Sequence, residues 1–267
     1  MSNLLIEQHG AILQITFNRP DKKNAVTPQM VVQLAEAWRR FRDDAELRVA
    51  ILTGNGDAFC VGADLGRLIP LLSKARPPED EFDRTLVADR SIFQTAFLRR
   101  FELWKPIIAA VNGFALAGGM EILQATDIRL AVPEATFGLS EPKRGIIPGG
   151  GSTVRLPRQI PYAAAMRILL TGASMTAATA LHCGFVNEIV PREKILETAY
   201  AIAGEIAENA PLAVQKIKEV VARTSGLPLE DAFAIEDEAA RTVMRSEDAK
   251  EGPRAFMEKR KPNFRGR

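Results

Sequence analysis

The sequence predicts an α/β fold, because apolar runs of strand length alternate with helical patterns before the chain turns to helical patterns alone. The clearest strand is the run 106–111, whose continuous hydrophobicity is typical of a buried strand. With 267 residues, 46% of them hydrophobic, the chain can form a sizeable core as one large domain or two small ones.

The first elements are expected to be a strand, a helix and a second strand. Residues 11–17 alternate apolar and polar side chains, which predicts a strand with one buried face. Thr27 is a favourable N-cap residue and Pro28 suits the first helical position, so we expect a helix from there towards Phe41. The apolar residues 49–53 predict the next strand.

The segment before the buried strand at 106–111 is irregular in pattern. Prolines and a cluster of acidic side chains occupy residues 66–85, which predicts a mobile loop. Residues 86–104 have a helical pattern, and we expect them to lead into the buried strand.

Beyond Gly184 the chain is expected to be helical. The helical patterns cover residues 191–208, 210–224, 228–244 and 246–260. We therefore divide the chain into a core, residues 1–204, and a C-terminal helical region, residues 205–267. One apolar face keeps helical spacing at Ala232, Ile235, Ala239 and Val243. This face either packs on its own subunit or builds contacts between subunits.

Composition narrows the classes of partner and the compartment. Thirty-five basic and 33 acidic residues give a net charge of +2, which predicts no general affinity for nucleic acid or membrane. Basic residues crowd the C-terminus, as a solvated tail or a ligand contact. Cys60 and Cys183 have no metal-site spacing and fit a reducing compartment. With no leader-like or membrane-spanning stretch, we expect a cytoplasmic protein.

Glu121 is the first candidate catalytic residue. It ends the segment 115–121, in which Gly118 and Gly119 predict a turn that opens a helix. At a helix start several backbone N–H groups lack partners and the peptide dipoles favour negative charge. A developing oxyanion is therefore favoured beside Gly118, and the Glu121 carboxyl group is expected near it, where it can exchange a proton.

Glu141 is the second candidate, within a segment that runs into the glycine-rich stretch 145–151. Pro142 restricts the residue before it, so Glu141 is expected in a turn or extended conformation rather than within a helix. A third glycine-containing segment lies upstream at 57–65. Two separated turns can direct two N–H groups at one carbonyl oxygen, which is the minimum for an oxyanion hole.

Each candidate glutamate also has a structural interpretation, and the other motifs of the chain are incomplete. A single helix-start or turn glutamate usually meets a dipole or a salt bridge, so neither Glu121 nor Glu141 is strong evidence alone. Phe59 replaces the third glycine of a dinucleotide-binding turn, and Gly119 occupies the lysine position of a Walker loop. No Gly-x-Ser-x-Gly occurs and His182 is expected to be structural, which argues against a Ser-His hydrolase.

Motifs along nearly the whole chain resemble the crotonase, or enoyl-CoA hydratase/isomerase, family. They are Asn18-Arg19-Pro20 with Asn24-Ala25, residues 59–65, 111–121 and 137–151, and the tail 259–264. The resemblance implies a spiral of ββα units with a C-terminal helical region used for trimerisation. Because both glutamates are present, the pattern is most similar to the hydratases, which convert a 2-enoyl-CoA thioester to a 3-hydroxyacyl-CoA.

The resemblance also implies roles for individual residues. The N–H groups of Ala63 and Gly118 would hold the thioester oxygen, while Glu121 deprotonates water and Glu141 supplies the α-proton. The implied contacts with the acyl-CoA are Lys23, Ala25, Ala63, Asp64, Leu65, Phe114, Gly118, Pro142, Lys261 and Phe264. Asp64 has a second interpretation, as the cap of a helix that begins at Leu65. No metal or redox cofactor is implied, because coenzyme A is part of the substrate, and a homotrimer or a dimer of trimers is expected.

The chain departs from the family pattern at two positions: the first leaves the Gly118 N–H in place, and the second concerns the acyl group rather than the reaction. Ala117 replaces the first glycine of a common Gly-Gly-Gly run, and Ser140 stands where hydratases often have proline. One alternative function is an enoyl-CoA double-bond isomerase or another crotonase-type acyl-CoA lyase, which uses the same oxyanion hole. Another is a non-catalytic RNA-binding protein that uses the basic tail, against which the intact glutamate pair argues.

Overall fold

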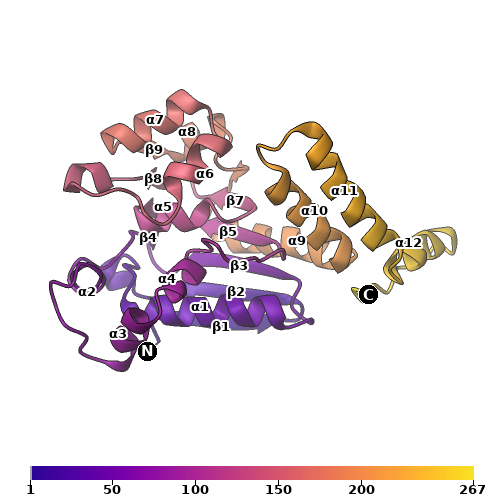
Figure 1. The fold of residues 1–267 in the computed structure, drawn as a ribbon, viewed down its shortest axis with the longest axis horizontal. Coiled ribbons are helices and arrows are strands. Elements are labelled where there is room, and N and C mark those ends of the chain that lie inside the picture. The colour runs from indigo at the N-terminus through magenta and orange to yellow at the C-terminus, as the bar shows by residue number, and fades with distance from the viewer. Residues whose placement is uncertain (1) are drawn as a thin grey trace.

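The computed structural model describes residues 2–267, which form two β-sheets with helices packed around them (Figure 1). The six-stranded sheet has the order β1 (Leu4–His9), β2 (Ile12–Phe17), β3 (Val49–Gly54), β5 (Ile107–Val111), β7 (Ile128–Ala131) and β10 (Glu188–Ile189). The four-stranded sheet has the order β4 (Ala58–Cys60), β6 (Phe114–Leu116), β8 (Thr136–Gly138) and β9 (Ser174–Thr176). Neighbouring strands are parallel except in the pairs β1–β2 and β8–β9. The predicted α/β class is confirmed.

Successive strands alternate between the two sheets, which gives the chain its spiral course. Strands β3, β5 and β7 join the large sheet, while β4, β6 and β8 join the small one. Helix α2 (Leu68–Leu72) follows β4, α5 (Gly118–Leu123) follows β6, and the 3-10 helix η2 (Glu141–Arg144) follows β8. The repeating unit is ββα, as the resemblance implied. Because β4, β6 and β8 are parallel neighbours, the segments that follow them leave the small sheet at the same edge.

The remaining helices cover the sheets or extend from them. They are α1 (Pro28–Asp43), α3 (Glu81–Ala88), α4 (Ser91–Ala96), α6 (Ser152–Gln159), α7 (Tyr162–Thr171), α8 (Ala177–His182), α9 (Ile195–Glu208), α10 (Pro211–Thr224), α11 (Leu229–Met244) and α12 (Asp248–Met257), with 3-10 helices η1 (Pro20–Lys22) and η3 (Arg192–Lys194). Helix α1 begins as predicted, with Pro28 in its first turn and the Thr27 hydroxyl accepting a hydrogen bond from the Met30 N–H. Strand β1 was not predicted.

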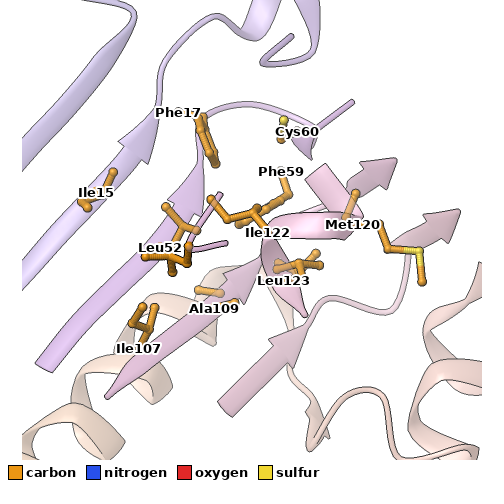
Figure 2. Close-up of a cluster of buried hydrophobic side chains, with 14 of the residues drawn as sticks. Ile15, Phe17, Leu52, Phe59, Cys60, Ile107, Ala109, Met120, Ile122 and Leu123 are labelled. Carbon is orange, nitrogen blue, oxygen red and sulfur yellow. The ribbon is translucent and has the colours of Figure 1, made fainter. Parts of the chain in front are cut away.

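The core between the two sheets fixes the position of α5. Met120, Ile122 and Leu123 of this helix are buried beside Phe59 of β4 and the side chains of the large sheet (Figure 2). Gly119 allows the close approach, because a Cβ there would stand 2.0 Å from the Cys60 carbonyl oxygen. Glu121 belongs to the same short helix, so the packing that holds α5 also fixes the base of that side chain.

The predicted loop at residues 66–85 is wrong at Leu68–Leu72, which form α2, and from Glu81 onward, where α3 begins, and the stretch between these helices is irregular. Its acidic residues are not all solvated. Asp83 is fully buried and pairs with Arg76 at 2.5 Å, while the Asp80 side chain caps α3 by accepting from the Asp83 N–H. Arginines of the same segment neutralise charges that composition alone assigns to solvent.

The expected helix at residues 86–104 is also interrupted. Helix α3 ends at Ala88, and α4 covers only Ser91–Ala96. Beyond it, Leu98 (φ 51°) and Arg100 (φ 56°) take left-handed conformations that an α-helix does not allow. The helical pattern therefore marked two short helices and a turn rather than one continuous helix.

The C-terminal helices are present as predicted but are poorly buried. Every residue of α10 and α11 is at least partly exposed, and these two helices pack mainly on each other. Large apolar side chains on α10 to α12 face outward, among them Ile217, Val221, Leu229, Phe233, Met244 and Phe256. Figure 1 shows α11 and α12 extending away from both sheets. The predicted face, Ala232, Ile235, Ala239 and Val243, is the half-buried side of α11, whose main contacts are with α10 of the same chain, whereas Leu229, Phe233 and Met244 remain exposed.

Candidate active site

The segments that follow β4, β6 and β8 surround one cavity of about 700 Å³. Its apolar lining consists of Val61, Leu65, Ile69, Leu72, Phe93, Phe97, Leu116, Ile146 and Ile147. Both candidate glutamates, Glu121 and Glu141, line it, and so do Ala63 and Gly118. The fold thus brings together four residues from three different ββα units.

Glu121 lies in the first turn of α5, and 5% of it is exposed. Its Oε1 accepts hydrogen bonds from the Gly150 N–H at 2.7 Å and the Ser152 N–H at 3.4 Å. Burial raises the pKa of Glu121, although these two N–H groups counteract the rise. Gly150 leaves room for the carboxyl group, because a Cβ there would stand 2.7 Å from Oε2.

Glu141 opens η2 and lies outside any regular α-helix, as predicted from Pro142. It is 7% exposed, and its buried Oε2 has no hydrogen-bond partner among residues 2–267. Burial, together with the charge of Glu121, raises the pKa of Glu141 to about 7, while the Arg144 cation opposes the rise. Near neutral pH the two carboxyl groups can therefore hold different protonation states.

Two backbone N–H groups at the cavity are candidates for an oxyanion hole. The Val26 N–H donates to the Gly62 carbonyl at 2.8 Å, and the Val26 carbonyl accepts from the Asp64 N–H at 2.9 Å, which directs the Ala63 N–H away from Val26. Within residues 2–267 the N–H groups of Ala63 and Gly118 donate to no other group. The two turns are close, since a Cβ on Gly62 would stand 2.9 Å from the Gly118 nitrogen.

Ala117 directs the chain into α5 through an uncommon conformation, φ 49° and ψ −125°. Such positive φ values favour glycine and cost other residues about 1–3 kcal/mol. Hydrogen bonds on both sides hold the residue there: its N–H donates to the Gly138 carbonyl of β8 at 2.8 Å, and its carbonyl accepts from the Glu121 N–H at 2.9 Å. Ala117 thus replaces the family's glycine at the expense of backbone strain. The Gly118 N–H at the start of α5 still donates to no group within residues 2–267.

Asp64 has a structural role at the cavity wall. Its Oδ2 pairs with the Arg19 guanidinium at 2.9 Å, and its Oδ1 accepts from two N–H groups of the following turn. Arg19 also donates to the Ala25 carbonyl at 2.6 Å. This arginine therefore joins the motif at residues 18–25 to the motif at residues 59–65. The regular helix begins at Leu68 rather than at Leu65, because a turn intervenes.

The predicted acyl-CoA contacts fall into two groups. Those that line the cavity with the glutamates are Ala25, Ala63, Asp64, Leu65 and Gly118. Those outside the lining are Lys23, Phe114, Pro142, Lys261 and Phe264. The Lys23 ammonium lies over the Phe114 ring, 4.7 Å from its centroid, and Pro142 is exposed on η2.

The C-terminal residues of the second group lie far from the cavity within one chain. Lys261 pairs with Glu208 at 3.1 Å, and the Phe264 ring lies against Gly252. In Figure 1 the C-terminus is at the opposite end of the molecule from α2. A contact of Lys261 or Phe264 with the same ligand would therefore need a second subunit, and it stays a prediction.

Some cavity residues were missed by sequence reasoning. Phe93 and Phe97 were hidden because their segment was expected to be one regular helix. Gly150 was visible within the glycine-rich stretch, but the run gave no indication that its N–H binds Glu121. The signal that could have located it is the glycine stretch itself, since side-chain-free backbone approaches a ligand or carboxylate closely.

That the protein needs no metal and has no membrane association remains a prediction. No group of three or more His, Cys, Asp or Glu side chains in residues 2–267 is arranged to hold a metal ion. Over the same range, no helix is long and apolar enough to cross a bilayer.

Comparisons with known proteins show the family of the chain. Residues 7–267 match the family model described as enoyl-CoA hydratase/isomerase. The chain is 45% identical to the enoyl-CoA hydratase EchA19 of Mycobacterium tuberculosis, covering 98% of this chain and 96% of the relative. It is 38% identical to (E)-benzylidenesuccinyl-CoA hydratase of Thauera aromatica, with 98% of both chains covered. A crystal structure of an enoyl-CoA hydratase from M. tuberculosis matches with a TM-score of 0.87 at 39% identity over 99% of each chain. The chain belongs to the enoyl-CoA hydratase/isomerase family and has its crotonase fold.

Proposed function

We propose that this chain adds water across the double bond of a 2-enoyl-CoA thioester and so forms a 3-hydroxyacyl-CoA. The observation that carries the proposal is the unequal pair of buried glutamates in one cavity: Glu121 accepts N–H hydrogen bonds, while Glu141 keeps an unbonded oxygen. Two relatives, one named for enoyl-CoA and the other for (E)-benzylidenesuccinyl-CoA, are both named hydratases, which supports the same reaction here.

The proposed mechanism assigns one task to each group. The N–H groups of Ala63 and Gly118 bind the thioester oxygen and draw electrons from Cβ as negative charge develops on that oxygen. Glu121, as the ionised carboxylate, takes a proton from water while the water oxygen bonds to Cβ. Glu141, as the protonated acid, delivers its proton to Cα. Glu121 then releases a proton to solvent and Glu141 takes one up, which restores both carboxyl groups. The hydration needs no metal or redox cofactor.

Coenzyme A is proposed to enter along the wall formed by Lys22, Ala25 and Asp64, with the acyl group against the apolar lining. We also propose a homotrimer or a dimer of trimers, because apolar side chains of α10 to α12 are exposed in one chain. In such an assembly Lys261 and Phe264 reach the ligand of a neighbouring subunit. A monomer in sedimentation at micromolar concentration would contradict the assembly.

A substrate assay tests the reaction directly. The protein is given 2-enoyl-CoA thioesters and their 3-enoyl isomers over a range of acyl lengths, and products are separated by mass and retention. We expect a gain of one water on the 2-enoyl substrates. Conversion of 3-enoyl to 2-enoyl thioesters without hydration would assign the chain to the isomerases instead.

A further inference from the structure

Arg155 of α6 links two segments of the cavity wall that are far apart in sequence. Its guanidinium donates to the carbonyl groups of Phe97, at 3.3 Å, and Leu98. Its partners there are backbone carbonyl groups rather than carboxylates, so hydrogen bonds rather than an ion pair hold the guanidinium. Burial lowers the pKa of Arg155, while the negative charge of Glu121 opposes that shift.

The turn that Arg155 holds is conformationally costly. Leu98 is left-handed, and the bonds from its N–H to Thr95 and from the Arg99 N–H to Gln94 form the helix end that usually contains glycine. Leu98 is nevertheless buried, so the turn carries a packed side chain at a position where the backbone conformation favours glycine. The guanidinium of Arg155 binds the two carbonyls that this turn exposes, which stabilises it.

This turn places an aromatic ring against the oxyanion site. Phe97 lines the cavity and stacks on Phe93 with centroids 4.6 Å apart. Its Cε1 would stand 3.1 Å from a Cβ built on Gly118, so the ring covers the first residue of α5. Any shift of the turn therefore moves the ring that packs against Gly118.

The other end of the Arg155 link is the loop that holds Glu121. Gly151, at φ 129°, precedes α6, and a Cβ there would stand 3.2 Å from the guanidinium. Its neighbour Gly150 donates to Glu121, and the Arg99 side chain adds a second link by donating to the Gly149 carbonyl at 3.0 Å. One cluster thus connects the loop around the proposed base with the ring over the proposed oxyanion donor.

We propose that Arg155 is a positioning residue for hydration: it acts through Phe97, holding the ring over Gly118 while the same cluster fixes the loop around Glu121. The kinetic test of this inference rests on the proposed function. Its effect belongs to the transition state, because the oxyanion site must be dry and correctly placed when charge develops.

The test compares Arg155→Met and Arg155→Lys with Arg158→Met, an exposed arginine of the same helix that does not line the cavity. We expect Arg155→Met to lower kcat about ten- to a hundredfold and to change KM by about threefold at most. Arg155→Lys should recover part of kcat, and Arg158→Met should match the parent. Parental kcat in a folded Arg155→Met protein would overturn the proposal.

A binding measurement makes the inference independent of turnover. A 3-oxoacyl-CoA forms an enolate that absorbs in the near ultraviolet, and an intact oxyanion site favours this enolate. We expect Arg155→Met to shift the enolisation of the bound ligand to higher pH while Arg158→Met does not. If the parent binds this ligand but hydrates no enoyl-CoA, the proposed function fails while this measurement still tests Arg155.

A double-mutant cycle separates positioning from general support of the fold. Phe97→Leu removes the ring but keeps the α4 end, and it should produce a loss similar to that of Arg155→Met. If Arg155 acts through Phe97, the double variant loses much less than the product of the two single losses. Fully multiplicative losses would overturn the proposal, and so would Arg155→Met losing activity only in proportion to its unfolded fraction.

Discussion

The segments around Glu121 and Glu141 line the same cavity but hold their carboxyl groups in opposite ways. The Glu121 carboxyl group is fixed by N–H donors of a glycine loop, whereas Glu141 starts a 3-10 turn and leaves Oε2 unbonded. Hydrogen bonds to the charged form favour a carboxylate, and burial without them favours the acid. Local backbone, rather than residue type, therefore distinguishes the proposed base, Glu121, from the proposed acid, Glu141.

The largest expected effect comes from neutralising either group. Glu121→Gln and Glu141→Gln should each lower hydration about a hundredfold or more, since positioned acid–base groups contribute on that scale. Titration with the substrate-like thioester should show retained binding. Near-parental turnover in one variant would remove that residue from the mechanism, and lost binding would indicate a folding role.

A smaller change should disturb only the Glu121 side of the comparison. Gly150→Ala places a methyl group where the Glu121 carboxyl group lies, and because the glycine has no left-handed φ, the backbone itself accepts alanine. We expect kcat to fall about tenfold or more through displacement of the carboxylate. The matched control is Gly149→Ala, whose Cβ would have its nearest neighbour at 3.9 Å. Equal activity of both variants would show that the Gly150 contact does not position Glu121.

The start of α5 provides a stability test. Ala117→Gly relieves the positive φ, which is worth about 1–3 kcal/mol, and loses about 0.5–1 kcal/mol through the added freedom of the unfolded chain. We therefore expect a gain of about 1 kcal/mol in the free energy of unfolding, measured by urea titration. A loss of stability would mean that contacts of the Ala117 methyl group outweigh its strain.

The smallest expected effect concerns the Glu141 side and its pH dependence. In the proposed mechanism Glu141 is the protonated acid, so kcat/KM should fall as pH rises through about 7. Arg144 lowers the pKa of Glu141, so Arg144→Met should raise that pKa and move this fall to higher pH. Lys143→Met, at the adjacent exposed residue, is the control. A shift to lower pH, or an equal shift in both variants, would contradict this electrostatic assignment.

Prediction from sequence succeeded where local chemistry carries the information. The strand at 106–111, the cap at Thr27 and the helix opened by Gly118 each follow from residues adjacent in the chain. The candidate glutamates came from the same kind of local pattern, supported by the family resemblance. Their different environments could not be predicted, because the Gly150 N–H that binds Glu121 lies in a later segment.

The failures have a common physical cause. Residues 66–85 look solvated in composition, but Arg76 and Asp83 neutralise each other within the fold. The helical pattern at 86–104 continues past α4 in sequence, whereas the left-handed turn at Leu98 is held by Arg155 from another segment. Tertiary contacts determine the structure of both segments, and local propensity does not include those contacts.

The alternation of strands between two sheets also sets an order on folding. The two proposed oxyanion donors follow β4 and β6, which pair Ala58 with Phe114 across a long stretch of intervening chain. Closing such a loop costs conformational entropy before any contact compensates for it, and parallel pairing of this kind forms slowly. Neither donor is in place when its own strand forms. The proposed oxyanion site therefore cannot be complete before β6 has paired with β4, and a nascent chain that stops before β6 lacks the Gly118 donor.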